Sequence, residues 1–339
     1  MPITIHDVAK RLNLSITTVS RALDGYDDVA EETRKLVVAT AQEMGYVPNR
    51  AARQLRRKRT DTIGYILPAG VPQFADPFFS EFIAGLGDEA ALKKYDLLIS
   101  TASPGTEAEK SLYMRWIQGH KVDGVVLNRI RLEDWRVSYL TEHGLPYVCL
   151  ERPSDPVEYV GVEVDSRSGF NHVIAHLIEL GHRRIAYIGT SSIYKIQADR
   201  FAGYREGLAA VGISFDPVLI GEGDLTPSGG YQAAQRLLDL PERPTAITCI
   251  NDLTAIGVLH AAHERGLEVG QDLAVTGFDG IADAAHTQPP LTTLNQPVYD
   301  VARQLASMLL TQINGQPLPH RQVIIQPELL IRQSTTGER

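Results

Sequence analysis

The sequence predicts a small all-α head joined to a larger α/β core of two lobes. Residues 4–24 carry the pattern of a helix, a tight turn and a second helix, which is typical of a helix-turn-helix. From residue 62 onward, short apolar strands alternate with helical stretches, which indicates parallel sheets covered by helices on both faces. These strands are too many for one compact sheet, so two doubly wound lobes are expected, divided near residue 162.

In the head, polar residues at the helix ends define the pattern. Thr4 is placed to cap the first helix and Ser15 to cap the second. Asn13 lies between the helices and tolerates the positive φ of a tight turn. The second helix then exposes side chains near its N-terminus, where a recognition helix meets base edges and phosphates. They are Ile16, Thr17, Thr18 and Arg21. Taken alone, this segment also fits an ordinary helical hairpin.

A basic segment one helix further on favours contact with nucleic acid. Residues 50–59 hold six Lys and Arg, with Leu55 among them and Asn49 in an N-cap position. Basic runs are often solvated linkers, but cations so near a reader helix neutralise phosphates. Residues 1–60 hold 11 Lys and Arg against 7 Asp and Glu, whereas the rest of the chain holds 22 against 34. Only the cationic head is therefore expected to touch DNA.

Bulk properties bound the class of protein. A chain of 339 residues with 43% hydrophobic and 22% charged residues is typical of a soluble protein with several cores. The N-terminus MPITIHDVAK shows no apolar signal region, and no run approaches the ~20 apolar residues of a membrane span. The protein is expected in the cytoplasm, over the nucleoid. Cys149 and Cys249 lie in apolar strand-like runs and are expected to be buried thiols.

The core strands follow from their apolar runs. They are predicted at 62–67, 95–100, 123–128, 146–151, 160–164, 184–189, 245–251 and 273–279. Helices between them are expected to end at a left-handed glycine, namely at Gly119, Gly144, Gly181, Gly212 and Gly266. Two late strands, at 291–297 and 322–332, flank a helix that starts near Val298.

Polar side chains that follow the strands predict a ligand site, because open α/β sheets bind ligands beyond the carboxyl ends of their strands. These candidates are Asp76, Asp165, Tyr194, Arg200, Asn251 and Asp279. Such groups can hold two neighbouring sugar hydroxyls at once, and Phe78, Tyr194 or Phe278 could cover an apolar sugar face. Asp165 and a further strand-end residue, Asp252, also fit a structural role. Asp252 is expected to cap the helix that begins at Leu253, and Asp165 fits a cap as well as a ligand contact.

The motifs of the head resemble those of the lactose/galactose repressor (LacI/GalR) family. They are T-I-x-D-V-A from Thr4, S-x-x-T-V-S-R at 15–21, Y-V-P-N at 46–49 and A-x-x-L at 52–55. The resemblance continues to about residue 333. It implies a homodimer with a DNA-binding head at 1–47 and a hinge helix at 48–60. The DNA contacts that it implies are Thr4, Ser15, Ile16, Thr17, Thr18, Ser20, Arg21, Asn49, Ala52, Leu55 and Arg56.

For residues 61–339, the resemblance implies a type I periplasmic-binding-protein-like core with a three-strand crossover hinge. The chain would cross between lobes near 162, 291 and 322, so that 61–162 and 293–321 form one lobe and 163–291 and 322–333 the other. Arg200 in R-F-A-G and Asp279 in G-F-D-G match family effector positions. The function implied is a repressor of a carbohydrate-use operon, released by a mono- or oligosaccharide bound between the lobes.

Alternatives and departures from the family pattern limit this interpretation. A corepressor type that responds to a purine-like metabolite stays open, and so does a carbohydrate-active enzyme using Asp76 and Asp279. Standard nucleotide-binding, hydrolase and zinc motifs are absent, so neither enzyme activity nor a metal or other cofactor is expected. Leu225 stands where the lactose repressor has a pocket tryptophan, and Ala30 replaces the usual hydroxyl before the third helix.

Overall fold

The structure is a computed structural model that describes residues 3–47, 59–69, 76–154 and 158–337. The chain forms two compact units, Met1–Thr60 and Asp61–Arg339. Within the described ranges, no helix is long and apolar enough to cross a membrane. The basic segment 48–58, including Asn49, Ala52, Leu55 and Arg56, lies outside these ranges.

The first unit contains three short helices around one apolar core. They are α1 (Ile5–Leu12), α2 (Ile16–Leu23) and α3 (Glu31–Glu43). Val8, Val19 and Val37, one from each helix, are completely buried against one another. Each helix buries one side, with Ala9, Ala22 and Ala41 beside these valines, and leaves the opposite side to solvent.

The capping residues set the helix boundaries as the sequence predicts. Asn13 ends α1 with a φ of 53°, and Ser15 Oγ accepts the amide of Thr18 at 3.0 Å at the start of α2. The Asp7 carboxylate accepts the Thr4 amide at 2.8 Å and its hydroxyl at 2.7 Å. Ala30 precedes α3 without a side-chain cap, so this helix lacks the stabilisation that Ser or Thr gives.

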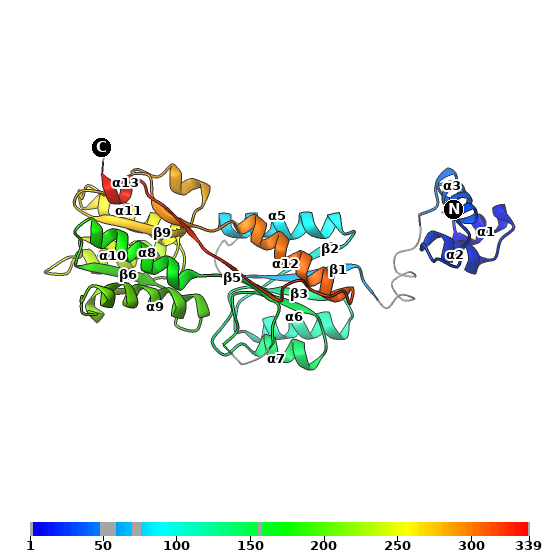
Figure 1. Cartoon of the computed structure of the whole chain (residues 1–339), viewed down its shortest axis with the longest axis horizontal. Helices are drawn as coiled ribbons and strands as arrows, with labels where there is room; N and C mark the ends of the chain where they lie inside the picture. The colour runs from blue at the N-terminus through cyan, green and yellow to red at the C-terminus, as the bar shows by residue number, and fades with distance from the viewer. Residues whose placement is uncertain (1–2, 48–58, 70–75, 155–157, 338–339) are drawn as a thin grey trace. The chain divides into compact units, whose positions relative to one another are not determined.

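The second unit begins with a six-stranded parallel sheet in the order β11-β5-β4-β3-β1-β2. Its strands are β1 (Thr62–Pro68), β2 (Asp96–Ala102), β3 (Gly124–Leu127), β4 (Tyr147–Leu150), β5 (Gly161–Val164) and β11 (Gln322–Ile325). Helices α5 (Pro77–Leu92) and α12 (Val298–Ile313) cover one face, and α6 (Glu107–Gln118) and α7 (Trp135–Glu142) cover the other (Figure 1). We call this part the first lobe.

A second six-stranded sheet has the order β12-β10-β9-β8-β6-β7 and is parallel except for β12. Its strands are β6 (Ile185–Gly189), β7 (Ile220–Glu222), β8 (Ala246–Cys249), β9 (Ala274–Asp279), β10 (Thr292–Asn295) and β12 (Glu328–Leu330). Helices α8 (Ser166–Glu179) and α9 (Lys195–Ala210) pack on one face, and α10 (Pro227–Leu238) and α11 (Asp252–Glu264) pack on the other. The short α13 (Gln333–Thr336) packs near β9 and β10. This part is the second lobe.

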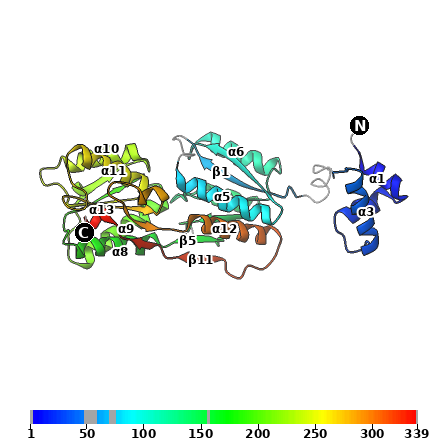
Figure 2. The same cartoon turned by 90° about the horizontal axis from the view of Figure 1, so that it is seen from above.

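The chain crosses between the lobes three times, but a few residues later than the sequence predicts. β5 stays in the first sheet to Val164, and β10 stays in the second sheet to Asn295. β11 pairs with β5 in the first sheet up to Ile325, where the two strands lie side by side (Figure 2). Segment 322–325 therefore belongs to the first lobe, contrary to the prediction, because an apolar run indicates a strand without naming its partner sheet.

Two further local expectations differ from the structure. Gly119 has a φ of −83° at the end of α6, and the left-handed residue there is His120 instead. The other four predicted glycine stops have positive φ. β7 was not predicted, because a three-residue strand with only one strongly apolar residue gives almost no periodic signal. Both cysteines are buried and unpaired, as predicted.

Candidate functional site

The exposed face of α2 carries most of the predicted base-reading residues. Ile16 is 41% exposed, and Thr17 beside it is also exposed. Ser20 is only 9% exposed, so it faces the core of the head rather than the reader surface. Thr18 is engaged locally, with its hydroxyl 2.8 Å from that of Ser15. The surface of α2 that can contact bases is therefore small. Arg21 is the only positively charged residue of this helix.

Arg21 is held in place by two neighbours in the loop after α2. Its Nε donates to Asp28 Oδ1 at 3.1 Å, and its Nη2 lies 2.5 Å from Asp28 Oδ2. The guanidinium also lies over the ring of Tyr26, 4.5 Å from the centroid. A planar group fixed along one edge and one face has little freedom left, so Arg21 is pre-oriented.

The second unit contains a cleft between its lobes, with an empty volume of about 590 Å³ up to its open mouth. The first lobe lines it with residues at or after strand ends and with the start of α5, namely Asp76, Phe78, Asn128, Arg129, Leu150, Glu151 and Val164. The second lobe contributes Ser166, Ile196, Arg200, Leu225, Asn251, Asp279 and Gln296. Both walls thus come from the carboxyl ends of the strands, where open α/β sheets bind ligands.

Arg200 and Asp279 form the ionic centre of the second-lobe wall. Arg200 lies 3.6 Å above the ring centroid of Phe278, donates to the Ile250 carbonyl, and places Nη2 4.0 Å from Asp279 Oδ1. Burial raises the pKa of Asp279 well above its usual value, although Arg200 acts to lower it. Arg200 is only 5% exposed, so this ionic centre is buried in the wall of the cleft and does not lie on an exposed rim.

Asn251 lines the cleft but has its polar atoms engaged. Its Oδ1 accepts the Thr254 amide at 3.0 Å and caps α11, and its Nδ2 donates to the Leu225 carbonyl. The expected cap, Asp252, instead lies in the first turn and is fully buried, accepting from the Ile281 amide. Burial raises the pKa of Asp252 to about 7. Helix α11 therefore begins one residue earlier than predicted, at Asp252, and Asn251 is its N-cap.

Asp76 and Phe78 are brought to the first-lobe wall at the start of α5. Asp76 Oδ1 accepts the Phe78 amide at 3.0 Å, so Asp76 both caps the helix and borders the cleft. Burial raises the pKa of this carboxyl, against the effect of Arg129. The ring of Phe78 stacks on that of Phe82 with centroids 5.7 Å apart, which supplies an apolar surface at the cleft.

Two predicted ligand residues are not among those lining the cleft. Asp165 caps α8 through the Ser168 amide and accepts Gln326 Nε2 at 3.0 Å, so it ties two crossover segments together. Tyr194 pairs by its backbone with Arg131 in an antiparallel bridge. Sequence position after a strand does not determine where a side chain points, and both residues serve connections instead.

The cleft also contains residues that were not among the candidates. Asn128 and Arg129 follow β3, and Glu151 follows β4. The same strand-end rule that selects Asn251 and Asp279 applies to these positions. Burial raises the pKa of Glu151 to about 8, although Arg200 across the cleft lowers it.

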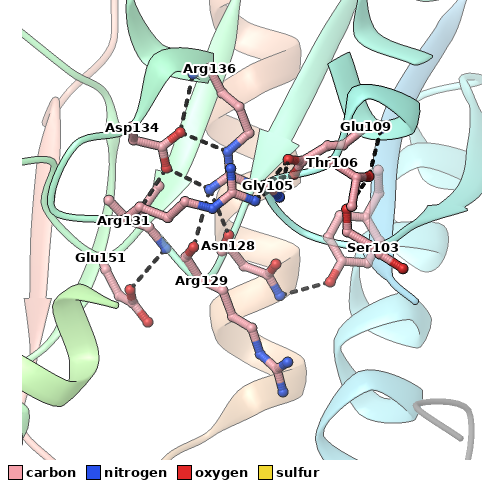
Figure 3. A network of polar contacts seen from close by, with 12 residues as sticks. Ser103, Gly105, Thr106, Glu109, Asn128, Arg129, Arg131, Asp134, Arg136 and Glu151 are labelled. Atoms are coloured by element: carbon pink, nitrogen blue, oxygen red, sulfur yellow. Dashed lines mark hydrogen bonds and ion pairs between the residues drawn. The ribbon is translucent and has the colours of Figure 1, made fainter. Parts of the chain in front are cut away.

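A buried charge network supports the loop that carries Asn128 and Arg129 (Figure 3). Arg131 Nη2 donates to both carboxylate oxygens of Glu109, at 2.7 and 2.9 Å. Arg136 pairs with Asp134 through Nε and Nη2, at 2.8 and 2.6 Å. Each buried charge is thus compensated, as burial requires.

Arg136 also reaches the backbone of this loop. Its Nη2 donates to the carbonyls of Asn128 at 3.3 Å and Arg129 at 3.1 Å. Asn128 Nδ2 donates to the Tyr65 hydroxyl at 2.7 Å. The loop is therefore a rigid part of the first-lobe wall.

The same loop meets the second lobe. The Leu132 amide donates to the Ile193 carbonyl, and the Lys195 amide to the Ile130 carbonyl, each at 2.9 Å. The Ile130 amide in turn donates to Glu151 Oε2 at 3.2 Å. This inter-lobe bridge, residues 130–132 with 193–195, joins the two lobes next to the cleft residues Arg129 and Ile196.

Comparison with known proteins places this geometry in a family. Residues 4–49 match the model of bacterial regulatory proteins of the lacI family, and 174–335 match a periplasmic binding protein-like domain. The transcriptional regulator CelR of Thermobifida fusca is 34% identical over 98% of both chains. The chain belongs to the LacI family. It is accordingly a DNA-binding transcription regulator, and its core has the type I periplasmic-binding-protein-like fold.

Solved LacI-family structures agree with both units. A CelR–cellobiose complex is 32% identical, with a TM-score of 0.76, and covers 98% of this chain and 99% of its own. The lac repressor dimer bound to operator and an anti-inducer is 26% identical, with a TM-score of 0.85, over 99% and 100%. These relatives are transcription regulators.

Proposed function

We propose that this LacI-family regulator is a homodimeric repressor of carbohydrate-use genes that releases its operator when a sugar binds between the lobes. The observation that carries this proposal is a polar cleft lined from both lobes, with Arg200 and Asp279 on one wall and Asp76 on the other. A ligand that contacts both walls favours one lobe angle over another and shifts the equilibrium by its differential affinity.

The chemistry of the cleft favours a sugar. Carboxylate, guanidinium and amide groups pair with vicinal hydroxyls, while Phe78, Leu150 and Leu225 offer apolar surface to ring carbons. The CelR relative has been solved with cellobiose. Because Leu225 supplies no aromatic ring, stacking in this chain would depend on Phe78.

On the DNA side, we infer that two heads read a pseudo-palindrome with half-sites about one helical turn apart. One α2 helix can contact only a few bases, so a dimer that presents two such helices makes twice as many base contacts. The lac repressor relative has been solved as an operator-bound dimer. Arg21 is assigned to guanine O6 and N7, and Leu55 to a minor-groove wedge. A regulator of this kind acts in the cytoplasm, where the chromosome lies.

Two rival functions make different predictions. A corepressor-type regulator would tighten operator binding when its metabolite binds. An enzyme would turn over an oligosaccharide, but the Asp76 carboxylate is used in a helix cap and Asp279 accepts Gln296 Nε2 at 2.7 Å. These engagements, together with the DNA-binding head, favour binding without catalysis.

Operator selection from a random duplex library, followed by fluorescence anisotropy with a sugar panel, tests the proposal. We expect a two-fold symmetric site and a sugar that weakens binding at constant ionic strength. Tighter binding with a metabolite would establish the corepressor type, and release of product sugars would establish an enzyme. A protein that stays monomeric with operator would contradict the dimer.

A further inference from the structure

Arg129 differs from the other arginines of the cleft in its backbone. It is not glycine, yet its φ is 47°, a left-handed conformation that costs energy for a residue with a Cβ and a long side chain. Arg136 holds the conformation by donating to the Arg129 carbonyl. The strain is thus maintained by a buried network, and its effect is to turn the Arg129 side chain away from that network (Figure 3).

The charge of the Arg129 guanidinium also differs from that of its neighbours, because among the described residues it has no carboxylate partner. Arg131, Arg136 and Arg200 each have a carboxylate within 4.0 Å. Among the residues that the structure describes, Arg129 makes no hydrogen bond or ion pair through its side chain, and its guanidinium lies over the Phe79 ring, 4.8 Å from the centroid. A half-buried cation without a counter-ion is costly unless a ligand supplies the charge.

Arg129 stands at the junction of two cavities. It lines the inter-lobe cleft, and together with Asn128 it also lines a second, small cavity. That second cavity is bordered by Arg131 and Arg136 as well. Arg131 is 7% exposed, and its buried Nε has no hydrogen-bond partner among the described residues. This end of the cleft is therefore rich in N–H donors.

The nearby carboxyls do not cancel the charge of Arg129. Glu109 and Asp134 are used by Arg131 and Arg136. Asp76 lies close enough for Arg129 to act on its pKa, but its Oδ1 accepts the Phe78 amide and, within the described residues, it forms no ion pair with Arg129. Glu151, with a pKa near 8, is mostly protonated at neutral pH. Among the described residues, the Arg129 guanidinium therefore has no carboxylate paired with it at the first-lobe end of the cleft.

We propose that Arg129 forms an anion subsite, so that the effector is a sugar carrying a phosphate or carboxylate group. The sugar hydroxyls would lie between Asp76 and Arg200, and the anion would accept from Arg129 at the entrance to the second cavity. Arginine suits both groups because its planar donors match their oxygens in pairs. The inference rests on the proposed sugar-responsive function and specifies its ligand class.

The test uses full-length protein and isothermal calorimetry with sugars that differ only in the anionic group. Glucose is compared with glucose 6-phosphate and glucuronate, galactose with galactose 6-phosphate and galacturonate, and cellobiose with cellobiose 6′-phosphate. We expect at least one anionic member to bind about tenfold tighter than its neutral partner or more. The phosphate and carboxylate arms identify which anion is preferred.

Arg129→Gln should abolish that preference, so that the variant binds the anionic sugar no tighter than the neutral partner. Arg205→Gln is the matched control, because Arg205 also lies over a phenylalanine, 5.2 Å from the Phe215 ring, but does not line the cleft. If Arg129→Gln fails to fold, competition by inorganic phosphate is measured with the wild-type protein instead. Phosphate should compete with the anionic sugar and not with a neutral one.

Three results would overturn the anion subsite: anionic sugars that bind no tighter than neutral ones or not at all, a preference that survives Arg129→Gln, or no competition by phosphate. Operator anisotropy with the same panel separates this from the proposed function. Release by a neutral sugar alone would keep the proposed function and reject the subsite. Tight anionic binding without any change in operator affinity would keep the subsite and reject the proposed function.

Discussion

Asp28 binds Arg21 along one edge of its guanidinium, through Nε and Nη2, at 3.1 and 2.5 Å. A guanidinium has five N–H donors in a fixed plane, so this edge pairing leaves Nη1 and the second Nη2 hydrogen directed outward. Those two donors match guanine O6 and N7. The carboxylate of Asp28 would repel phosphates, and its value for DNA binding is therefore to orient Arg21 rather than to add affinity.

This relationship predicts a change in specificity for Asp28→Asn. Loss of the edge pairing frees Arg21 to contact phosphates, so non-specific affinity should rise and the ratio of specific to non-specific affinity should fall about tenfold. Arg21→Ala should instead cost about 1–3 kcal/mol on the operator and relax one position in each half-site. Binding to a site library at several salt concentrations measures both.

Asp27→Asn is the control for Asp28→Asn, since it removes the same charge from an exposed neighbour. If the two variants change specific and non-specific binding equally, Asp28 acts only through net charge and does not orient Arg21.

Arg200→Met should affect both stability and signalling. Arg200 is buried, stacks on Phe278 and faces Asp279, so its loss leaves a buried carboxyl without its cation. We expect the free energy of unfolding to fall by about 3 kcal/mol, and the sugar response to be lost while operator binding remains. Urea denaturation and operator anisotropy measure the two effects.

The double variant Arg200→Met/Asp279→Asn should recover part of the lost stability, because it no longer buries an unpaired carboxyl. It should still fail to respond to sugar. A single Arg200→Met variant that keeps wild-type stability would show that Asp279 is compensated elsewhere.

The fold could be predicted in most elements because parallel strands buried on both faces give unmistakable apolar runs. What the sequence could not give was the partner of each run. QVIIQPELLIR was predicted as one strand, but the chain changes sheets at Gln326 and Pro327, so that β11 and β12 lie in different lobes. Nothing in the pattern distinguishes these two halves, since pairing depends on distant segments.

The cleft could be predicted in part for a similar reason. Strand ends located Asp76, Arg200, Asn251 and Asp279 at the cleft, because strand polarity alone places them. The sequence does not reveal the direction of a side chain, which is why Asp165 stayed open between a ligand contact and the helix cap that it forms. Arg129 was missed although its position after β3 satisfied the rule, and its left-handed backbone depends on Arg136, seven residues away in sequence.

Arg136→Met tests the buried network beneath the cleft. This change leaves Asp134 without its paired cation and frees the carbonyls of Asn128 and Arg129. We expect a loss of about 3–5 kcal/mol in the free energy of unfolding and weaker effector binding, because the loop is no longer fixed. Arg183→Met, at an exposed arginine, should leave both unchanged. Weaker binding without any loss of stability would contradict a supporting role for the network.

Glu151 predicts a pH dependence of stability. Its pKa is raised from 4.5 to about 8 by burial, so the folded state keeps a proton that the unfolded state releases. Below pH 4.5 both states hold the proton, and this contribution to stability is fully present. Between pH 4.5 and about 8 it is lost at about 1.4 kcal/mol per pH unit, and above that range no further loss follows.

Glu151→Gln isolates this contribution, because glutamine stays neutral and its Oε1 can still accept the Ile130 amide. Other carboxyls with raised pKa, such as Asp252, titrate in both proteins and largely cancel in the difference. Urea denaturation from pH 5 to 9 should therefore show the variant gaining stability relative to wild type up to about pH 8 and then levelling off. Glu142→Gln, at the exposed end of α7, should give no such trend. A difference between Glu151→Gln and wild type that stays constant with pH would mean that Glu151 is ionised in the folded state, and Arg200 would then be its partner across the cleft.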